Sequence, residues 1–281
     1  MALALVARAQ GLQKSQEWLS LRRKLLTASD CAAVLKQSLR TCGAYMEDFP
    51  QSDFVLKEGK SGNPYCTLSD VVGRKTHSQT NQFTGNESTF FGERFEPVVQ
   101  AHYARLNGTP IHEAGLLVDQ DNFWLGASPD GIVECPDLRL VEIKCPFHRT
   151  ATGIPPYYYW TQMQIQMQVC DVEECDYVCC SFIEFASASS WESHRLQHPD
   201  LTYGALSGKD FCFDPTVQWI DEQNCSVRLW CLEAYYCTTV KRRRDWFHLV
   251  QPDLYEVWRS FQGDHQVSKK IPQVVIPECI L

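Results

Sequence analysis

The segment between residues 91 and 185 constrains the fold more than any other part of the chain. It opens with "FGERFEPVVQAHYARLNG", whose apolar residues follow the spacing of an amphipathic helix over 91–107, with Pro97 expected near the first turn and Gly108 at the end. Three strand-like runs follow, punctuated by the turn sequences "SPDG" and "CPDL": 111–118, 123–133 and 138–146. A proline-started helix and a further strand complete the segment: 156–169 and 174–185. This order predicts an α/β core, a central mixed β-sheet flanked by helices.

The regions outside this core have weaker patterns. "SQEWLSLRRKLL" predicts a helix, and "TASDCAAVLK" offers Ser29 or Asp30 as the N-cap of a short second one. Residues 38–88 predict a poorly ordered or loop-rich connection with one helix near 64–73. We expect a single domain over 1–281, with the core motifs at about 15–185 and a mainly helical extension over 186–281. The clearest helical segments of that extension are "PTVQWIDEQNCSVRLWCLEAYY" and the stretch from Trp246 to Phe261.

The composition excludes several classes of protein. The chain has 281 residues, of which 44% are hydrophobic and 21% are charged, which is typical of a globular protein. No apolar run approaches the roughly 18–20 residues that span a bilayer, and the start lacks the pattern of a secretory signal. The net charge of −8 argues against a nucleic-acid coat protein, but it leaves room for an enzyme with a locally basic groove. Two basic runs, 22–24 and 241–244, are either phosphate contacts or solvated helix faces.

The fourteen cysteines are scattered, and no two of them have the C-x-x-C spacing. A chain of this length can bury a core without disulfides, so we expect reduced and mostly buried thiols in an intracellular protein. A zinc or iron–sulfur site stays open as an alternative for two looser groups, although their spacings match no common ligand pattern. These groups are Cys170, Cys175, Cys179 and Cys180, and Cys225, Cys231 and Cys237.

The residues that point to chemistry lie in "GASPDG" and "VEIKCP". Asp130 lies at a turn after a strand, where a side chain can be exposed. Glu142 and Lys144 are two apart on a strand and therefore point to one face, while Val141 and Ile143 point to the other. The spacing alone leaves two interpretations open. The three charged residues form a site, or they are a surface turn and an ordinary salt-bridged strand.

Paired carboxylates suit a hard metal ion such as Mg²⁺ or Mn²⁺. A lysine beside the metal can position water or stabilise the negative charge that develops on an attacked phosphodiester. Glu96, on the predicted helix over 91–107, is a candidate third carboxylate.

Four blocks, in this order, resemble the PD-(D/E)xK nuclease core and, more narrowly, the lambda exonuclease and YqaJ viral-recombinase family. They are "WLSLRRKLLTAS" at 18–29, "FGERFEP" at 91–97, "SPDG…VEIKCP" at 128–146 and "YYYWTQMQIQMQV" at 157–169. Together they span about residues 15–185. The resemblance implies a restriction-endonuclease-like fold. The segment 38–88 and the C-terminal hundred residues have no matching motif.

The resemblance also implies roles for individual residues at the metal. Asp130 and Glu142 resemble the family's metal-binding carboxylates, with the backbone carbonyl of Ile143 as a further ligand. Lys144 resembles its catalytic lysine, and Glu96 resembles the helix glutamate that supports the metal site.

Other residues resemble the family's supporting positions. Gln162 and Gln164 lie in the glutamine-rich helix where the family has an active-site glutamine, although "QMQIQMQ" permits several registers. Arg22 and Ser29 resemble the arginine and serine that hold a DNA phosphate, and the helix start after Ser29 is expected to help bind the anion.

The function implied is a Mg²⁺-dependent deoxyribonuclease, with Mn²⁺ able to substitute, acting 5′-to-3′ on double-stranded linear DNA in viral or phage-type recombination or replication. Implied partners are double-stranded DNA, a single-strand annealing protein and further copies of the chain, with no membrane. The expected location is intracellular, in the host cytoplasm or nucleus. The alternatives are a structure-specific or nicking endonuclease on the same core and a non-catalytic DNA-binding module.

Overall fold

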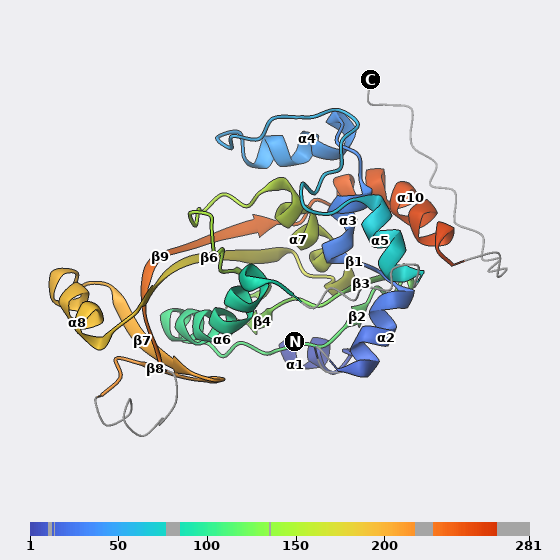
Figure 1. Cartoon of the computed structure of the whole chain (residues 1–281). Helices are drawn as coiled ribbons and strands as arrows, with labels where there is room; N and C mark the ends of the chain where they lie inside the picture. The colour runs from blue at the N-terminus through green and yellow to red at the C-terminus, as the bar shows by residue number, and fades with distance from the viewer. Residues whose placement is uncertain (11–12, 14, 77–84, 135, 217–226, 263–281) are drawn as a thin grey trace.

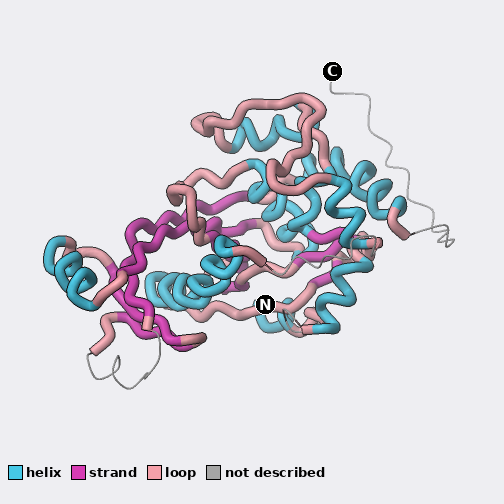
Figure 2. Tube along the Cα trace, in the orientation of Figure 1, coloured by secondary structure: helices cyan, strands magenta, loops and turns pink. Residues whose placement is uncertain are grey.

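A six-stranded mixed sheet forms the centre of the molecule. The computed structural model describes the chain except for residues 11–12, 14, 77–84, 135, 217–226 and 263–281. The strand order is β4-β5-β6-β9-β7-β8 (Figures 1 and 2), with β5 and β6 parallel and the other neighbours antiparallel. The strands are β4 (Gly131–Glu134), β5 (Leu138–Lys144), β6 (Glu174–Phe185), β7 (Thr202–Ser207), β8 (Asp210–Phe213) and β9 (Arg228–Lys241).

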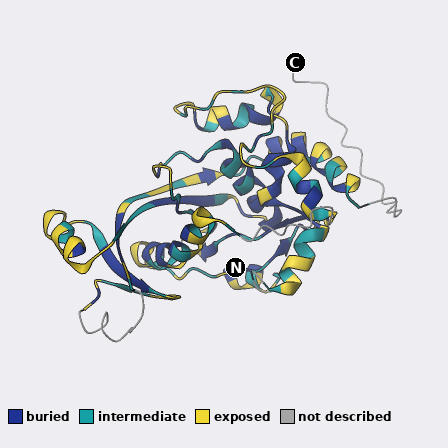
Figure 3. Cartoon of the chain, in the orientation of Figure 1, coloured by how far each residue is buried: buried dark blue, intermediate teal, exposed yellow. Residues whose placement is uncertain are grey.

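Helices cover both faces of this sheet at β5 and β6. Val141 and Ile143 belong to the core cluster of α6 (Glu87–Asn107), whereas Leu140 belongs to the cluster of α7 (Tyr157–Cys170). Figure 3 shows buried residues along these strands and exposed residues on the outer sides of the helices. Helix α7 is also the crossover that a parallel pair of strands requires. The predicted mixed sheet flanked by helices is therefore confirmed, as is the alternation along β5.

A second, three-stranded sheet lies beside the first. It has the order β1-β3-β2, with bounds β1 (Leu26–Thr27), β2 (Leu117–Val118) and β3 (Leu125–Ala127). Strand β1 pairs in parallel with β3, so that Thr27 lies opposite Gly126. This pairing brings the chain after α2 (Gln16–Lys24) next to the turn that leads to Asp130.

The amphipathic helix is longer than its pattern predicts. It begins at Glu87, where Asn86 accepts a hydrogen bond from the Thr89 amide, and it ends at Gly108 in the left-handed conformation (φ 63°). Pro97 therefore lies in the middle of the helix and not near its first turn. Because proline removes one backbone donor, the pattern alone favoured a later start.

The segment over 38–88, predicted to be poorly ordered or loop-rich, is loop-rich in its described part but contains one helix that the sequence did not predict. Helix α4 (Leu39–Asp48) is capped by Ser38, and its Tyr45 is buried and packs edge-on against Trp160 of α7. Helix α5 (Leu68–Lys75) confirms the helix expected near 64–73 and is capped by Thr67. Residues 77–84 lie outside the described residues.

The mainly helical extension over 186–281 is also corrected. Strands β7, β8 and β9 belong to the central sheet, and β9 pairs with β6 along nearly its whole length. The described part of the predicted helix over 215–236 is mostly strand, because four consecutive residues, Leu229 to Leu232, are buried between layers. A short buried run has no period that separates strand from helix. Helices α8 (Ala188–Gln197) and α10 (Arg244–Ser260) do confirm helix in this region.

The N-terminal segment lies beside the central sheet. Helix α1 (Ala2–Val6) packs near β4, where the terminal amino group contacts Glu134. None of the helices in the described residues is both long and apolar enough to cross a membrane.

The cysteines of the described part are free thiols and are mostly buried; Cys135, Cys225 and Cys279 lie outside it.

Candidate active site

Asp130 is held at the start of β4 by two neighbouring elements. Its Oδ2 accepts a hydrogen bond of 2.7 Å from the backbone amide of Ile143 on β5. Its own carbonyl accepts one of 2.9 Å from Gln100 on α6. The turn "SPDG" is thus tied both to the strand that carries Glu142 and to the long helix.

Glu142 is completely buried, with 0% of its surface exposed. The pleat of β5 turns it toward α7, whose Gln162 donates to Oε1 at 2.6 Å and whose Gln166 donates to Oε2 at 2.6 Å. The ammonium group of Lys144 forms an ion pair with Oε1. A buried carboxylate needs such donors, because an unpaired charge away from water is costly.

Lys144 lies at the end of β5, and its side chain is 20% exposed. Its Nζ lies 4.7 Å from the centre of the Tyr159 ring. Burial opposes the charge, but the carboxylates of Glu142 and Asp130 outweigh burial and raise the pKa of Lys144. The lysine is therefore a cation at neutral pH.

The carboxyl groups repel one another. Burial raises the pKa of Asp130 well above its usual range, and the charge of Glu142 raises it further. Glu96 of α6 acts on Asp130 in the same direction, while Lys144 opposes both. The structure therefore brings Asp130, Glu142 and Lys144 together, and Glu96 lies close enough to Asp130 to affect its pKa.

The donor set is consistent with a hard cation but does not by itself complete a site. In the part of the chain that the structure describes, no group of three or more acidic, histidine or cysteine side chains is arranged to hold a metal ion. Asp130 and Glu142 supply oxygen ligands, which Mg²⁺ prefers, and their mutual repulsion would be relieved by a cation. Backbone carbonyl groups and water would have to supply the remaining ligands.

The glutamines of α7 divide between two environments. Gln162 contacts Glu142 as predicted, but Gln164 does not lie in the site. Its amide nitrogen donates to the carbonyl of Lys241 at 2.8 Å, and its oxygen accepts from the Arg243 amide at 2.7 Å. Residues two apart on a helix face different directions, whereas residues four apart share a face. The second glutamine at the carboxylate is therefore Gln166, which the i, i+4 spacing from Gln162 could have indicated.

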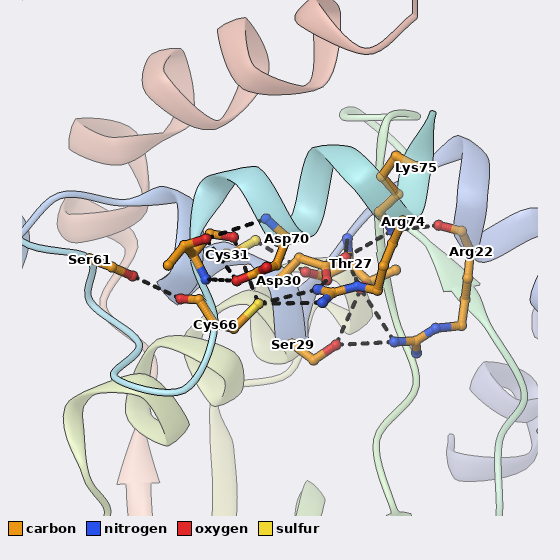
Figure 4. A network of polar contacts seen from close by, with 11 residues as sticks. Arg22, Thr27, Ser29, Asp30, Cys31, Ser61, Cys66, Asp70, Arg74 and Lys75 are labelled. Carbon is orange, nitrogen blue, oxygen red and sulfur yellow. Dashed lines mark hydrogen bonds and ion pairs between the residues drawn. The ribbon is translucent and has the colours of Figure 1, made fainter. Parts of the chain in front are cut away.

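Arg22 and Ser29 are adjacent, as the sequence predicted. The guanidinium of Arg22 donates to the Ser29 hydroxyl at 3.1 Å (Figure 4). It also lies 4.4 Å from the centre of the Trp18 ring. Trp18 also donates its indole N–H to Ser128 at 3.1 Å, two residues before Asp130. The pair therefore lies beside the turn that carries the first carboxylate.

The start of α3 (Ala28–Val34) differs from the expectation. Its N-cap is Thr27, which forms a capping box with Asp30, and neither Ser29 nor Asp30 is the cap. The helix has only seven residues, so we assign no anion-binding role to its dipole.

The profile of the YqaJ-like viral recombinase domain matches residues 17–173, more than half of the chain. The chain belongs to this family. The resemblance seen in the four sequence blocks is thereby confirmed, and the matched residues include every candidate described above.

A viral protein is similar to part of this YqaJ-like chain. It is 29% identical over 196 residues to an uncharacterized protein, R354, of Acanthamoeba polyphaga mimivirus. That match covers 64% of the chain and 30% of the relative, so the chain spans less than a third of the viral protein.

Solved structures confirm the fold. The alkaline exonuclease LHK-Exo from Laribacter hongkongensis is similar with a TM-score of 0.52 and 20% identity, over 88% of this chain and 93% of that one. The same exonuclease in complex with dAMP gives a TM-score of 0.51 at 20% identity, with the same coverage.

The second basic run of the YqaJ-like chain is engaged within the fold. Arg242 has a side chain only 3% exposed and pairs with Asp171 at 2.7 Å. Arg243 pairs with Asp48 of α4 at 2.5 Å, and Arg244 pairs with Glu173. These arginines join α10 to α4 and to the turn after α7. Arg242 is too buried for either interpretation from sequence, a DNA contact or a wet helix face, and for the rest of the run both interpretations stay predictions.

Proposed function

We propose that the protein is a metal-dependent exonuclease that hydrolyses linear double-stranded DNA in the 5′-to-3′ direction. One observation carries the proposal: two carboxylates and a cationic lysine, Asp130, Glu142 and Lys144, meet at the end of β5. Membership of the YqaJ-like viral recombinase family and the fold of an alkaline exonuclease support it.

Asp130 and Glu142 would hold Mg²⁺, or Mn²⁺ in its place, together with the carbonyl of Ile143. A bound cation would neutralise phosphate charge and make water a better nucleophile at neutral pH. Gln162 and Gln166 fix the orientation of the Glu142 carboxylate through one hydrogen bond to each oxygen.

Lys144 would stabilise charge and position water. The carboxylates of Glu142 and Asp130 raise its pKa and favour the charged ammonium form. A fixed ammonium group near the attacked phosphate stabilises the negative charge of the transition state. Glu96 would support the metal site from α6.

Arg22 and Ser29 would bind the 5′-terminal phosphate of the strand to be cut. The planar guanidinium can contact two phosphate oxygens, and the hydroxyl adds a further donor. Because one relative of the chain is viral, we propose that the activity occurs in an infected cell, in the cytoplasm or nucleus. A single-strand annealing partner and a homo-oligomer remain predictions.

Digestion of linear, nicked and covalently closed circular DNA, with Mg²⁺ or with a chelator, tests this function. We expect metal-dependent release of nucleotides from linear DNA and an intact closed circle. Cutting of the closed circle would identify an endonuclease on the same core. Binding of DNA without cleavage of any substrate in Mg²⁺ or Mn²⁺ would indicate a non-catalytic module.

The two kinds of glutamine on α7 give a further prediction. Gln166→Leu removes a donor from buried Glu142 and should lower the rate of DNA cleavage by about 10-fold or more, the usual range for residues that orient metal ligands. Gln164→Leu is the matched control, because Gln164 lies on a different face of α7, and it should keep the cleavage rate per folded molecule. Initial rates on linear duplex measure both variants, and equal losses would contradict the assignment of Gln166.

A further inference from the structure

A group of charged side chains surrounds Arg22 and Ser29. Some members of this group lie outside the four sequence blocks. Arg74 and Lys75, at the end of α5, meet Asp30 of α3 immediately beside Ser29 (Figure 4). Three cationic side chains thus face one carboxylate. Burial lowers the pKa of Arg22, and the nearby charge of Arg74 lowers it further, so the cations repel one another.

Lys75 is fully engaged in holding the fold. Its side chain is 6% exposed, and its Nζ lies 2.8 Å from the Oδ2 of Asp30. It also donates to the carbonyl oxygen of Arg22 at 2.6 Å. The same Oδ2 accepts from the hydroxyl of Thr27 at 2.6 Å. Lys75 and Asp30 therefore fix α2, α3 and α5 relative to one another at the position of Arg22.

Arg74 is engaged more weakly. Its side chain is 45% exposed, and one nitrogen lies 3.1 Å from the Oδ1 of Asp30. Its other contacts, at 3.4 and 3.5 Å, are to the sulfur of Cys66, which is a weak acceptor. A phosphate oxygen is a much stronger partner for a guanidinium than a thiol is.

We propose that Arg74 is a second phosphate-binding guanidinium, which acts with Arg22 and Ser29 on the terminal phosphate of a 5′-phosphorylated DNA strand. The proposal rests on the proposed function and adds a residue that determines end specificity. A terminal phosphate carries about −1.5 to −2 charges at neutral pH, whereas an internal phosphodiester carries one. Asp30 and Lys75 neutralise each other, so Arg22 and Arg74 contribute two positive charges. These two charges match the larger negative charge of a terminal phosphate. Exchange of Cys66 for a phosphate oxygen would leave the contact of Arg74 with Asp30 in place.

Equilibrium binding without cleavage tests the proposal. Fluorescence anisotropy in the presence of a chelator compares a duplex with a 5′-phosphate and the same duplex with a 5′-hydroxyl. We expect the unmodified protein to prefer the phosphorylated end, and Arg74→Gln to reduce that preference by about 10-fold, the scale of a hydrogen bond to a charged group. Arg23→Gln, which removes a neighbouring charge of the same kind, should weaken binding of both ends equally.

The outcomes separate this proposal from the proposed function. A preference that Arg74→Gln leaves unchanged overturns the role of Arg74, whatever the nuclease activity. Equal affinity of the unmodified protein for both ends overturns it as well. Loss of the phosphate preference in Arg74→Gln supports it even where no DNA is cut, and failure of cleavage in Mg²⁺ and Mn²⁺ would then contradict only the proposed function.

Discussion

Replacing Glu142 with glutamine is expected to lower the rate of DNA cleavage by about 10²–10³-fold or more, the scale of losing a strong electrostatic stabiliser. The variant keeps the shape of the buried side chain but removes the charge that would bind the cation and that pairs with Lys144. Release of nucleotides from linear duplex in Mg²⁺ measures the rate, and thermal unfolding checks the fold. We expect a folded variant whose melting temperature changes little or falls, because the repulsion between Glu142 and Asp130 is lost together with the ion pair of Glu142 with Lys144.

Glu184→Gln is a matched control on the neighbouring strand. Glu184 on β6 accepts a hydrogen bond from Arg94 at 2.9 Å and forms an ion pair with it. It therefore carries the same charge as Glu142 but lies outside the candidate active site. It should keep nearly full activity. Asp130→Asn should behave like Glu142→Gln, and Lys144→Ala should lose about 10²-fold. Full activity of either carboxylate variant would remove these residues from the catalytic site.

Replacing Lys75 with methionine should reduce the free energy of unfolding by about 3 kcal/mol, because removal of one partner leaves the other as a poorly compensated buried charge. The side chains of Lys75 and Asp30 are 6% and 7% exposed, and the carboxylate would keep its ion pair with Arg74 and its hydrogen bond from Thr27 but lose its buried cation. Urea unfolding at neutral pH measures the loss. Lys60→Met, at an exposed lysine, should change the stability by less than about 0.5 kcal/mol.

The same pair predicts a dependence on pH. Burial alone would raise the pKa of Asp30, but the charges of Lys75 and Arg22 and its hydrogen bonds hold it well below its usual range. The folded state therefore favours the ionised carboxylate. This stabilisation is present above the unfolded pKa of about 4 and is lost as the pH falls below it. The double variant Asp30→Asn with Lys75→Met, which leaves neither partner charged and unpaired, should lack this part of the acid sensitivity of the unmodified protein. An unchanged acid dependence would show that Asp30 is not its source.

The local patterns of the sequence predicted which residues share a face at the centre of the site, and the family resemblance implied that they form a site. The period of two along β5 placed Glu142 and Lys144 on one face and Val141 and Ile143 on the other, as the two core clusters confirm. The turn after β3 placed Asp130 within reach of that strand. These features depend on neighbouring residues, whose geometry follows from the backbone itself.

Other features depended on contacts between distant segments. The buried run Leu229–Leu232 has no period of its own, and only pairing with β6 makes it a strand. In "QMQIQMQ" the i, i+4 spacing pairs Gln162 with Gln166 and Gln164 with Gln168, and only the position of Glu142 shows which pair lies at the carboxylate.

The sequence by itself determined the fold class and the strand that carries the carboxylate and the lysine, and the family resemblance implied that Arg22 and Ser29 lie together. Only the tertiary structure decided that Arg74 and Lys75, more than forty residues from Asp30 in the chain, meet it beside that pair. The physical reason is that periodicity and capping act over a few residues. An ion pair between two helices has no local signal, because it depends on how the whole core packs.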